Sequence, residues 1–213
     1  MLDPVNVLWD PGVPSYHRPM AQEPTTRERL LELASTVFAE EGYASASVRD
    51  LAARSDLTSG AIYGNFRSKA DLLMAAIDSH IYEDLVRDLA LNPPEGVSRI
   101  ADVLGHVFAG YADRRQLRAL LVEGAVAGRG DADVRERLQR DQSDHLAQWS
   151  EIYEVWQERR EIDPQLDVQA LVTMLWAMEL GLGVLEAIGL ELPEGSELGE
   201  VVTRFMRGVE PDS

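Results

Sequence analysis

Apolar residues recur at helical spacing along almost the whole chain. Leu30, Ala34, Val37 and Phe38 form the first stripe, which is typical of an amphipathic helix with one face buried. Similar stripes follow as far as residue 208, and no segment shows the strict alternation of a half-buried strand. The pattern predicts an all-α fold of about nine helices.

Capping motifs and helix breakers set the expected bounds. Thr25 with Glu28 forms a capping box, and Ser47 with Asp50 and Ser68 with Asp71 repeat the same signal. Gly42 ends the first helix. Two short helices follow, starting near residues 47 and 58, and the later helices are expected at 69–91, 97–112, 116–127, 132–160, 167–188 and 197–208.

Charge divides the chain unevenly. The net charge is −17, with a pI near 4.5. Residues 20–72 hold 6 basic and 8 acidic side chains, whereas residues 73–213 hold 13 basic and 27 acidic ones. We therefore expect an irregular, proline-rich extension at 1–22, a small domain at 23–70 and a strongly acidic domain at 71–213.

Several classes of protein are disfavoured. The chain has no cysteine, which excludes disulfides and thiolate metal sites. The chain has no run of 18 apolar residues, so no membrane-spanning helix is expected. The N-terminus lacks the pattern of a secretory signal, and a cytoplasmic location is therefore expected. His80, His106 and His145 lie on separate predicted helices without metal-ligand spacing, and no phosphate-binding loop or nucleophile elbow is present. We expect no metal, no cofactor and no enzyme activity, although an all-α enzyme remains an alternative.

The segment LTSGAIYGNFRSKADLL, residues 57–73, is the part most suggestive of function. Leu57, Ala61, Ile62 and Phe66 share one helical face, which leaves Ser59, Gly60, Tyr63 and Asn65 facing outward. Small residues allow another surface to come close, and the Tyr63 hydroxyl could reach a phosphate or a base edge. Lys69 in the next helix, and Ser47 and Arg49 before it, would add anion contacts. A half-buried tyrosine and a solvated lysine are the alternative interpretation of the same residues.

Residues 26–73 resemble the DNA-binding region of the tetracycline-repressor family of bacterial regulators. The family pattern has an apolar-Ala pair, a turn, Ser or Thr, Gly, two residues, Tyr, and then Phe and a spaced Lys. The matching residues here are Leu51-Ala52, Thr58, Gly60, Ile62-Tyr63, Phe66 and Lys69. Gly64 departs from the pattern, because the family usually has a bulky residue there.

The resemblance implies roles for individual residues in binding double-stranded DNA. Thr58, Ser59, Gly60, Tyr63 and Asn65 would lie in or beside the major groove, and Ser47, Arg49, Tyr63 and Lys69 would touch phosphates. The start of the first helix, at Thr26 and Arg27, would lie near the DNA backbone. We expect little direct base readout and a larger part for DNA shape.

The last two helices carry the spacing of a helix–helix seam. Leu171, Leu175, Met178, Leu182 and Leu185 recur at intervals of four and three. With Val202, Phe205 and Met206 they could form a four-helix interface in a homodimer. The alternative is that these residues fill the core of a single chain.

The resemblance also implies a small-molecule effector that binds an apolar pocket in the middle of the chain. The residues expected there are Phe108, Tyr111, Leu120, Glu123, Trp149, Tyr153, Trp156, Met174 and Met178, with Trp176 in the same region. Aromatic residues at helical spacing can equally be ordinary core. Glu123 and Glu179, acids among apolar neighbours, are either pocket carboxylates or residues at a helix edge.

The functional prediction is a ligand-responsive, DNA-binding transcription regulator without membrane association. It is expected to be a homodimeric repressor that a small, largely apolar molecule releases from a palindromic operator. A dimeric ligand sensor that has lost DNA binding is the first alternative.

Overall fold

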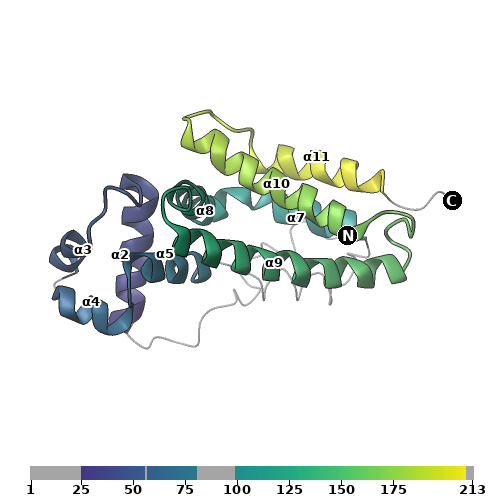
Figure 1. Ribbon diagram of the computed structural model, residues 1–213. Helices are drawn as coiled ribbons and strands as arrows, with labels where there is room; N and C mark the ends of the chain where they lie inside the picture. The colour runs from purple at the N-terminus through teal and green to yellow at the C-terminus, as the bar shows by residue number, and fades with distance from the viewer. Residues whose placement is uncertain (1–24, 56, 81–98, 210–213) are drawn as a thin grey trace.

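The protein is all-α in the residues that the computed structural model describes, which are 25–55, 57–80 and 99–209 (Figure 1). In these ranges it has nine α-helices, one 3₁₀ helix and no strand, which confirms the predicted fold class. The elements are α2 (Thr26–Glu41), α3 (Val48–Arg54), α4 (Ser59–Asn65), α5 (Lys69–Asp78), α7 (Ile100–Ala109), η1 (Tyr111–Arg114), α8 (Arg115–Ala127), α9 (Ala132–Glu158), α10 (Val168–Ala187) and α11 (Gly195–Arg207). The predicted extension at 1–22 lies outside the described residues.

The helices form two groups. In Figure 1, α3 and α4 lie at the end of the molecule farthest from α11, and α2 lies between them and α5. We call α2, α3, α4 and the start of α5, residues 25–70, the headpiece, and α7 to α11 the body. Helix α2 packs on α5 and α8, and α5 also contacts α8 and α9, so these helices join the headpiece to the body.

Local capping explains where the headpiece helices begin. Thr25 Oγ1 accepts from the Glu28 amide at 3.2 Å while Glu28 Oε2 accepts from the Thr25 amide at 2.8 Å, which is a complete capping box. Ser47 and Ser68 accept from the backbone amides of Asp50 and Asp71 in the same way. The three predicted helix starts are therefore confirmed.

Helix α5 is shorter than expected. The predicted helix ran to residue 91, but α5 ends at Asp78. The Ser79 hydroxyl donates to the Ala76 carbonyl at 2.8 Å and His80 Nδ1 lies 2.9 Å from the same oxygen, so side chains compete for the acceptor that the helix would need to continue. Residues 81–98 lie outside the described part of the chain.

The segment predicted as one helix at 97–112 is interrupted in the structure. Helix α7 ends at Ala109, and Tyr111–Arg114 forms the 3₁₀ helix η1. The Arg114 guanidinium donates to the carbonyls of Val107 and Gly110, at 2.8 and 3.2 Å, and so satisfies the end of α7. Helices α8 to α11 begin and end within two residues of their predicted bounds.

Two apolar cores hold the molecule together. The first contains the inner faces of α2 to α5 together with Leu117, Leu120 and Leu121 of α8 and Val134 of α9. The second joins α7, the end of α9, α10 and α11. Because the first core crosses residue 70, the headpiece packs continuously onto the body; the domain boundary there stays a prediction.

Helices α7 and α11 cross at very close range. A methyl group on Gly199 would lie 2.5 Å from the Gly105 carbonyl oxygen, and one on Gly195 would lie 2.1 Å from the Ala109 carbonyl oxygen. Neither position has room for a side chain. The backbones meet directly, and α11 is thereby fixed against α7.

Helix α10 has an unusual composition. Among the described residues it is the one helix long and apolar enough to cross a membrane, judged by length and composition alone, and 33% of its apolar window is buried within this chain. Its two acidic residues, Glu179 and Glu186, are both ion-paired to arginines of the body. The expected absence of membrane association stays a prediction.

Candidate nucleic-acid interface and effector cavity

Helix α4 is anchored by its inner face and exposes its outer face. Ile62 and Phe66 are buried in the first core, and the Thr58 hydroxyl caps the helix by accepting from the Ala61 amide at 3.1 Å. Tyr63 is 54% exposed. Thr58 and Gly60 are also exposed, whereas Ser59 is half-buried. Apart from Ser59, these exposures agree with the outward face expected from the sequence.

Two residues of this face are open to different degrees. Asn65 is exposed, but its side-chain amide donates to the Ala61 carbonyl of its own helix at 2.9 Å. That donor must be released before it can contact a base. At Gly64, a methyl group would have nothing within 4 Å, so the missing bulky residue leaves open space rather than meeting a steric need of this fold.

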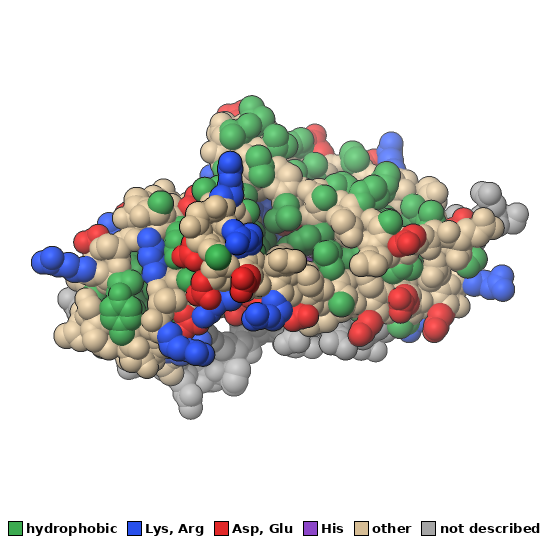
Figure 2. Space-filling model, viewed as in Figure 1, with side chains coloured by type: hydrophobic (Ala, Val, Ile, Leu, Met, Phe, Trp, Pro, Cys, Tyr) green, Lys and Arg blue, Asp and Glu red, His purple; other side chains and the backbone are tan. Residues whose placement is uncertain are grey.

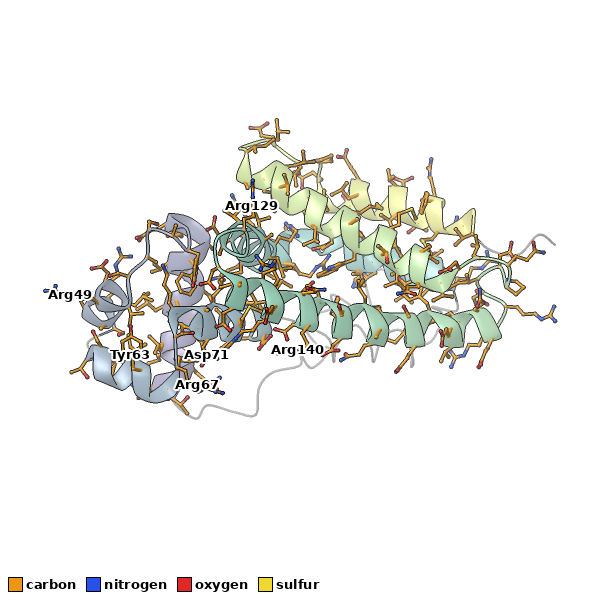
Figure 3. All side chains as sticks on the ribbon, in the orientation of Figure 1. Arg49, Tyr63, Arg67, Asp71, Arg129 and Arg140 are labelled. Carbon is orange, nitrogen blue, oxygen red and sulfur yellow. The ribbon has the colours of Figure 1, made fainter. Side chains whose placement is uncertain are left out.

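Some of the side chains expected to contact phosphates are exposed, and others are bound to neighbouring residues of the headpiece. Arg49 is exposed on α3, at the outer end of the molecule, and Tyr63 and Arg67 lie on and just beyond α4 at the same end (Figure 3). The Ser47 hydroxyl is engaged in capping and donates to Asp50 Oδ2 at 2.6 Å. Lys69 Nζ lies 4.2 Å from the centre of the Tyr43 ring, and burial lowers its pKa.

Arg67 was not among the predicted contacts. It is an exposed cation in the loop between α4 and α5. Its backbone amide donates to Asp71 Oδ2 at 2.9 Å, and Arg137 of α9 binds the other Asp71 oxygen at 2.7 Å. The Arg67 amide and the Arg137 guanidinium hold the pKa of Asp71 below its usual value. Its position in the sequence, directly after the α4 segment, could have identified Arg67 as a candidate phosphate contact.

An apolar cavity of about 100 Å³ lies in the body. It is lined by residues from α7, α8, α9 and α10 together with η1: Leu104, Val107, Phe108, Arg114, Leu117, His145, Leu146, Trp149, Tyr153, Val172, Leu175, Trp176 and Glu179. The Trp176 and His145 ring centres lie 4.4 Å apart with the rings tilted by 48°. Burial raises the pKa of the Tyr153 hydroxyl. The cavity is the natural candidate for an effector site.

Three of the predicted pocket residues line this cavity: Phe108, Trp149 and Tyr153. The other six do not. The Tyr111 hydroxyl donates to the Pro193 carbonyl at 2.9 Å, and Leu120 and Trp156 are buried in the first and second cores. Glu123 accepts a hydrogen bond from the Tyr43 amide in the headpiece.

Met174 and Met178 were placed on the wrong side of α10. Both are exposed, because the rotation of α10 turns Val172, Leu175, Trp176 and Glu179 inward at intervals of three, one and three. His145 and Arg114 were missed, since a histidine in a charged helix and an arginine between Asp113 and Arg115 carry no apolar signal.

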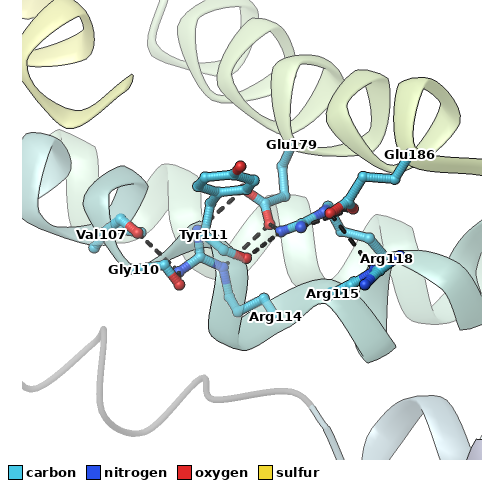
Figure 4. A network of polar contacts seen from close by, with 8 residues as sticks. All are labelled: Val107, Gly110, Tyr111, Arg114, Arg115, Arg118, Glu179 and Glu186. Atoms are coloured by element: carbon cyan, nitrogen blue, oxygen red, sulfur yellow. Dashed lines mark hydrogen bonds and ion pairs between the residues drawn. The ribbon is translucent and has the colours of Figure 1, made fainter. Parts of the chain in front are cut away.

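Glu179 belongs to a buried ion network (Figure 4). Arg114 Nε and Nη2 each lie 3.1 Å from a Glu179 oxygen, and Arg118 Nη1 lies 3.1 Å from Glu179 Oε1. Arg118 is fully buried; its Nε donates to Glu186 Oε2 at 2.9 Å, and its Nη2 makes a 2.8 Å ion contact with the same oxygen. Arg115 lies 4.0 Å from Glu186. Glu179 therefore lines the cavity with its charge compensated by two arginines.

The predicted interface residues also divide into two sets. Leu171, Leu175, Val202 and Met206 are buried in the second core of the same chain, so these four cannot form the centre of an interface. Leu182 is half-buried and packs against the same core. Leu185 and Phe205 are exposed as expected. The large exposed apolar side chains of α10 and α11, with the residue that follows α10, are Met174, Met178, Val184, Leu185, Ile188, Val201 and Phe205. Figure 2 shows hydrophobic side chains gathered over α10.

A helix-turn-helix headpiece on a helical body is the architecture of a class of DNA-binding transcription regulators. The model of the family described as "Bacterial regulatory proteins, tetR family" matches residues 30–76. The chain is 33% identical over 129 residues to the HTH-type transcriptional repressor Rv3405c of Mycobacterium tuberculosis, a match covering 54% of this chain and 68% of that protein. The match with the regulator YerO of Bacillus subtilis is 28% identical over 102 residues and spans 45% of this chain but 35% of that protein.

Solved structures share the fold. Salmonella enterica GusR superposes with a TM-score of 0.70 at 23% identity, covering 91% of this chain and 99% of GusR. Bacillus subtilis FadR, in complex with stearoyl-CoA, superposes with a TM-score of 0.66 at 16% identity, covering 84% of this chain and 96% of FadR. The chain belongs to the tetR family of bacterial regulatory proteins and is a transcriptional regulator.

Proposed function

We propose that this regulator is a homodimeric repressor that leaves a palindromic operator when a small, largely apolar molecule binds in the cavity. The observation that carries the proposal is the outer face of α4. Tyr63 is exposed on a helix whose other side is anchored by Ile62 and Phe66, so the helix presents the ring outward. A solvent-facing tyrosine among small residues suits close approach to a DNA groove.

The body supports the other parts of the proposal. The exposed apolar face of α10 and α11 suits a second copy of the chain, because two headpieces are needed to read a palindrome. The cavity is lined mainly by apolar and aromatic side chains, and the Glu179 carboxylate in its wall is bound by two arginines. Such a lining favours an uncharged, apolar effector over a cation.

A genomic footprint with the purified protein should recover a palindromic site, and Tyr63→Ala should bind it about tenfold more weakly, a loss of about 1.4 kcal/mol. Binding should also weaken with salt, by about 0.9 log unit per log unit of salt for each phosphate neutralised. Fluorescence anisotropy with the recovered fragment measures both quantities.

Tyr63→Phe is the matched control, because it keeps the ring and removes only the hydroxyl. Its affinity for the recovered fragment should lie between those of the parent and Tyr63→Ala. Specific binding with no salt dependence, or equal affinity of Tyr63→Ala and the parent, would contradict the proposed interface.

Filling the cavity should block the effector response. Val172 lines the cavity and is buried, so Val172→Phe places a ring where the effector would bind. Trp149 and Trp176 line the same space, so their emission reports occupancy when a panel of apolar compounds is titrated. A compound that quenches this emission in the parent should not do so in Val172→Phe.

The volume of about 100 Å³ is below that of most ligand sites, so binding should also widen the cavity.

Val126→Phe is the control for Val172→Phe. It adds the same ring at an exposed position of α8 and should leave the effector response intact. Release of DNA by the compound from Val172→Phe, at the parent's concentration, would place the effector site elsewhere.

A dimeric ligand sensor without DNA binding is the second candidate. It is favoured by the engagement of Ser47, Asn65 and Lys69 within the headpiece, which leaves fewer free groups for a polyanion. The footprint separates the two: a sensor would bind apolar compounds and leave no protected site in the genome.

We propose no catalytic role, in line with the regulators that this chain resembles. We place the protein in the cytoplasm, where a transcription regulator meets its DNA.

A further inference from the structure

A carboxylate of the body reaches into the headpiece at one point. Glu123 Oε2, on α8, accepts a hydrogen bond from the backbone amide of Tyr43 at 2.7 Å. Tyr43 lies in the turn between α2 and α3, and 80 residues separate the two partners in the sequence. A charged acceptor makes this bond stronger than a bond between neutral groups.

The turn is built for this approach. Gly42 has φ of 86°, in the left-handed region, where other residues are strained. A methyl group at Gly42 would lie 3.3 Å from Glu123 Oε2, closer than an ordinary contact. Glycine therefore serves both the backbone conformation and the close passage of the carboxylate.

The same tyrosine holds the lysine expected to contact DNA. The Lys69 ammonium lies 4.2 Å from the centre of the Tyr43 ring, and the Phe38 ring packs on Tyr43 with centres 5.7 Å apart. The backbone of Tyr43 is thus bound to the body while its ring fixes a cation of the headpiece. Tyr43 is the direct link between Glu123 and Lys69.

Helix α8 connects this link to the cavity. Leu117 on α8 lines the cavity, and Glu123 lies six residues further along the same helix, about 9 Å away along its axis. A helix of this length moves as a unit, so a displacement of Leu117 by a cavity ligand also displaces Glu123. The route reaches α5 at its first residue, Lys69.

We propose that Glu123 is a positioning residue for DNA binding: it holds the Tyr43 turn, and through the Tyr43 ring it sets the position of Lys69. This inference rests on the proposed DNA-binding function. Movement of α8 is carried to Lys69 by the same contact, which gives the cavity a path to the DNA surface.

The contact itself is tested without DNA. Amide hydrogen exchange at Tyr43 should be about tenfold faster in Glu123→Ala than in the parent, because the protecting acceptor is lost. Glu123→Gln keeps an oxygen acceptor and should stay close to the parent. Glu136→Ala removes one exposed negative charge from α9 and should leave Tyr43 exchange unchanged.

DNA affinity then distinguishes positioning from charge. Removing a negative charge should raise affinity for DNA, as expected for Glu136→Ala, whereas loss of positioning should lower it. We expect Glu123→Ala to bind the footprinted fragment about fivefold more weakly than the parent. Glu123→Gln keeps the oxygen acceptor and loses the charge, so its affinity should match that of Glu136→Ala. In a Lys69→Ala background, Glu123→Ala should have little further effect, because the group that it positions is gone.

Each outcome decides the inference. Unchanged Tyr43 exchange in Glu123→Ala, equal DNA affinities of Glu123→Ala and Glu136→Ala, or additive effects of Glu123→Ala and Lys69→Ala would overturn it. Failure of the parent protein to bind any DNA would instead reject the proposed function, and the exchange measurement would still report on the contact.

Discussion

Arg118→Met should lower the free energy of unfolding by about 3–5 kcal/mol, the usual cost of leaving a buried charge without its partner. Arg118 is fully buried and joins Glu179 to Glu186. Without it, Glu179 keeps only Arg114, and Glu186 keeps only Arg115, an exposed side chain 4.0 Å away. Urea denaturation followed by circular dichroism measures the loss.

The chain supplies a matched control for this change. Arg204 pairs with Glu200 on the surface of α11, where both side chains are largely exposed. Arg204→Met should cost less than about 1 kcal/mol, because exposed ion pairs contribute little. Adding Glu186→Gln to Arg118→Met should recover part of the stability, because Glu186 is the carboxylate left without a close partner, whereas Glu179 keeps Arg114. Equal losses for Arg118→Met and Arg204→Met would show that the network has no special part in stability.

Val184→Glu should convert the proposed homodimer into monomers and lower operator affinity about a hundredfold. Val184 is 50% exposed on the apolar face of α10, where a partner helix would bury a charge against apolar side chains. A monomer binds only one half-site and loses the gain from joining two headpieces. Sedimentation velocity gives the oligomeric state, and anisotropy with the footprinted fragment gives the affinity.

The same substitution at Val126 is the control. Val126 is 58% exposed on α8, outside the apolar face of α10 and α11, so Val126→Glu should change neither property. Leu175→Glu is unsuitable as an interface test, because Leu175 is buried in the second core and its loss would unfold the chain. A dimer that persists in Val184→Glu, or a parent protein that is monomeric at working concentrations, would reject this interface.

The headpiece could be predicted from the sequence in some detail because its signals are local. Thr25 with Glu28, and Ser47 and Ser68 with their acidic partners, satisfy amides within one turn of their own helices. The exposed face of α4 followed from the spacing of Ile62 and Phe66. Nothing distant had to be known to place these residues.

The cavity and the exposed face of α10 could not be predicted in the same way. Helical spacing identifies a buried face only when the opposite face is polar, and α10 is apolar on nearly every side. Its rotation is set by neighbours: Gly183 faces Arg118, and Glu179 binds Arg114 and Arg118. The interface and pocket predictions therefore included residues from the wrong sides of the helix.

The sequence by itself determined the helices, their starts and the outward face of the α4 helix, because caps and amphipathic spacing act over a few residues. Only the tertiary structure decided that Glu179 is compensated by arginines, that Glu123 binds the Tyr43 turn and that Lys69 rests on the Tyr43 ring. These contacts join residues that are 26 to 80 positions apart, and their existence depends on how the helices rotate and pack, which no local pattern specifies.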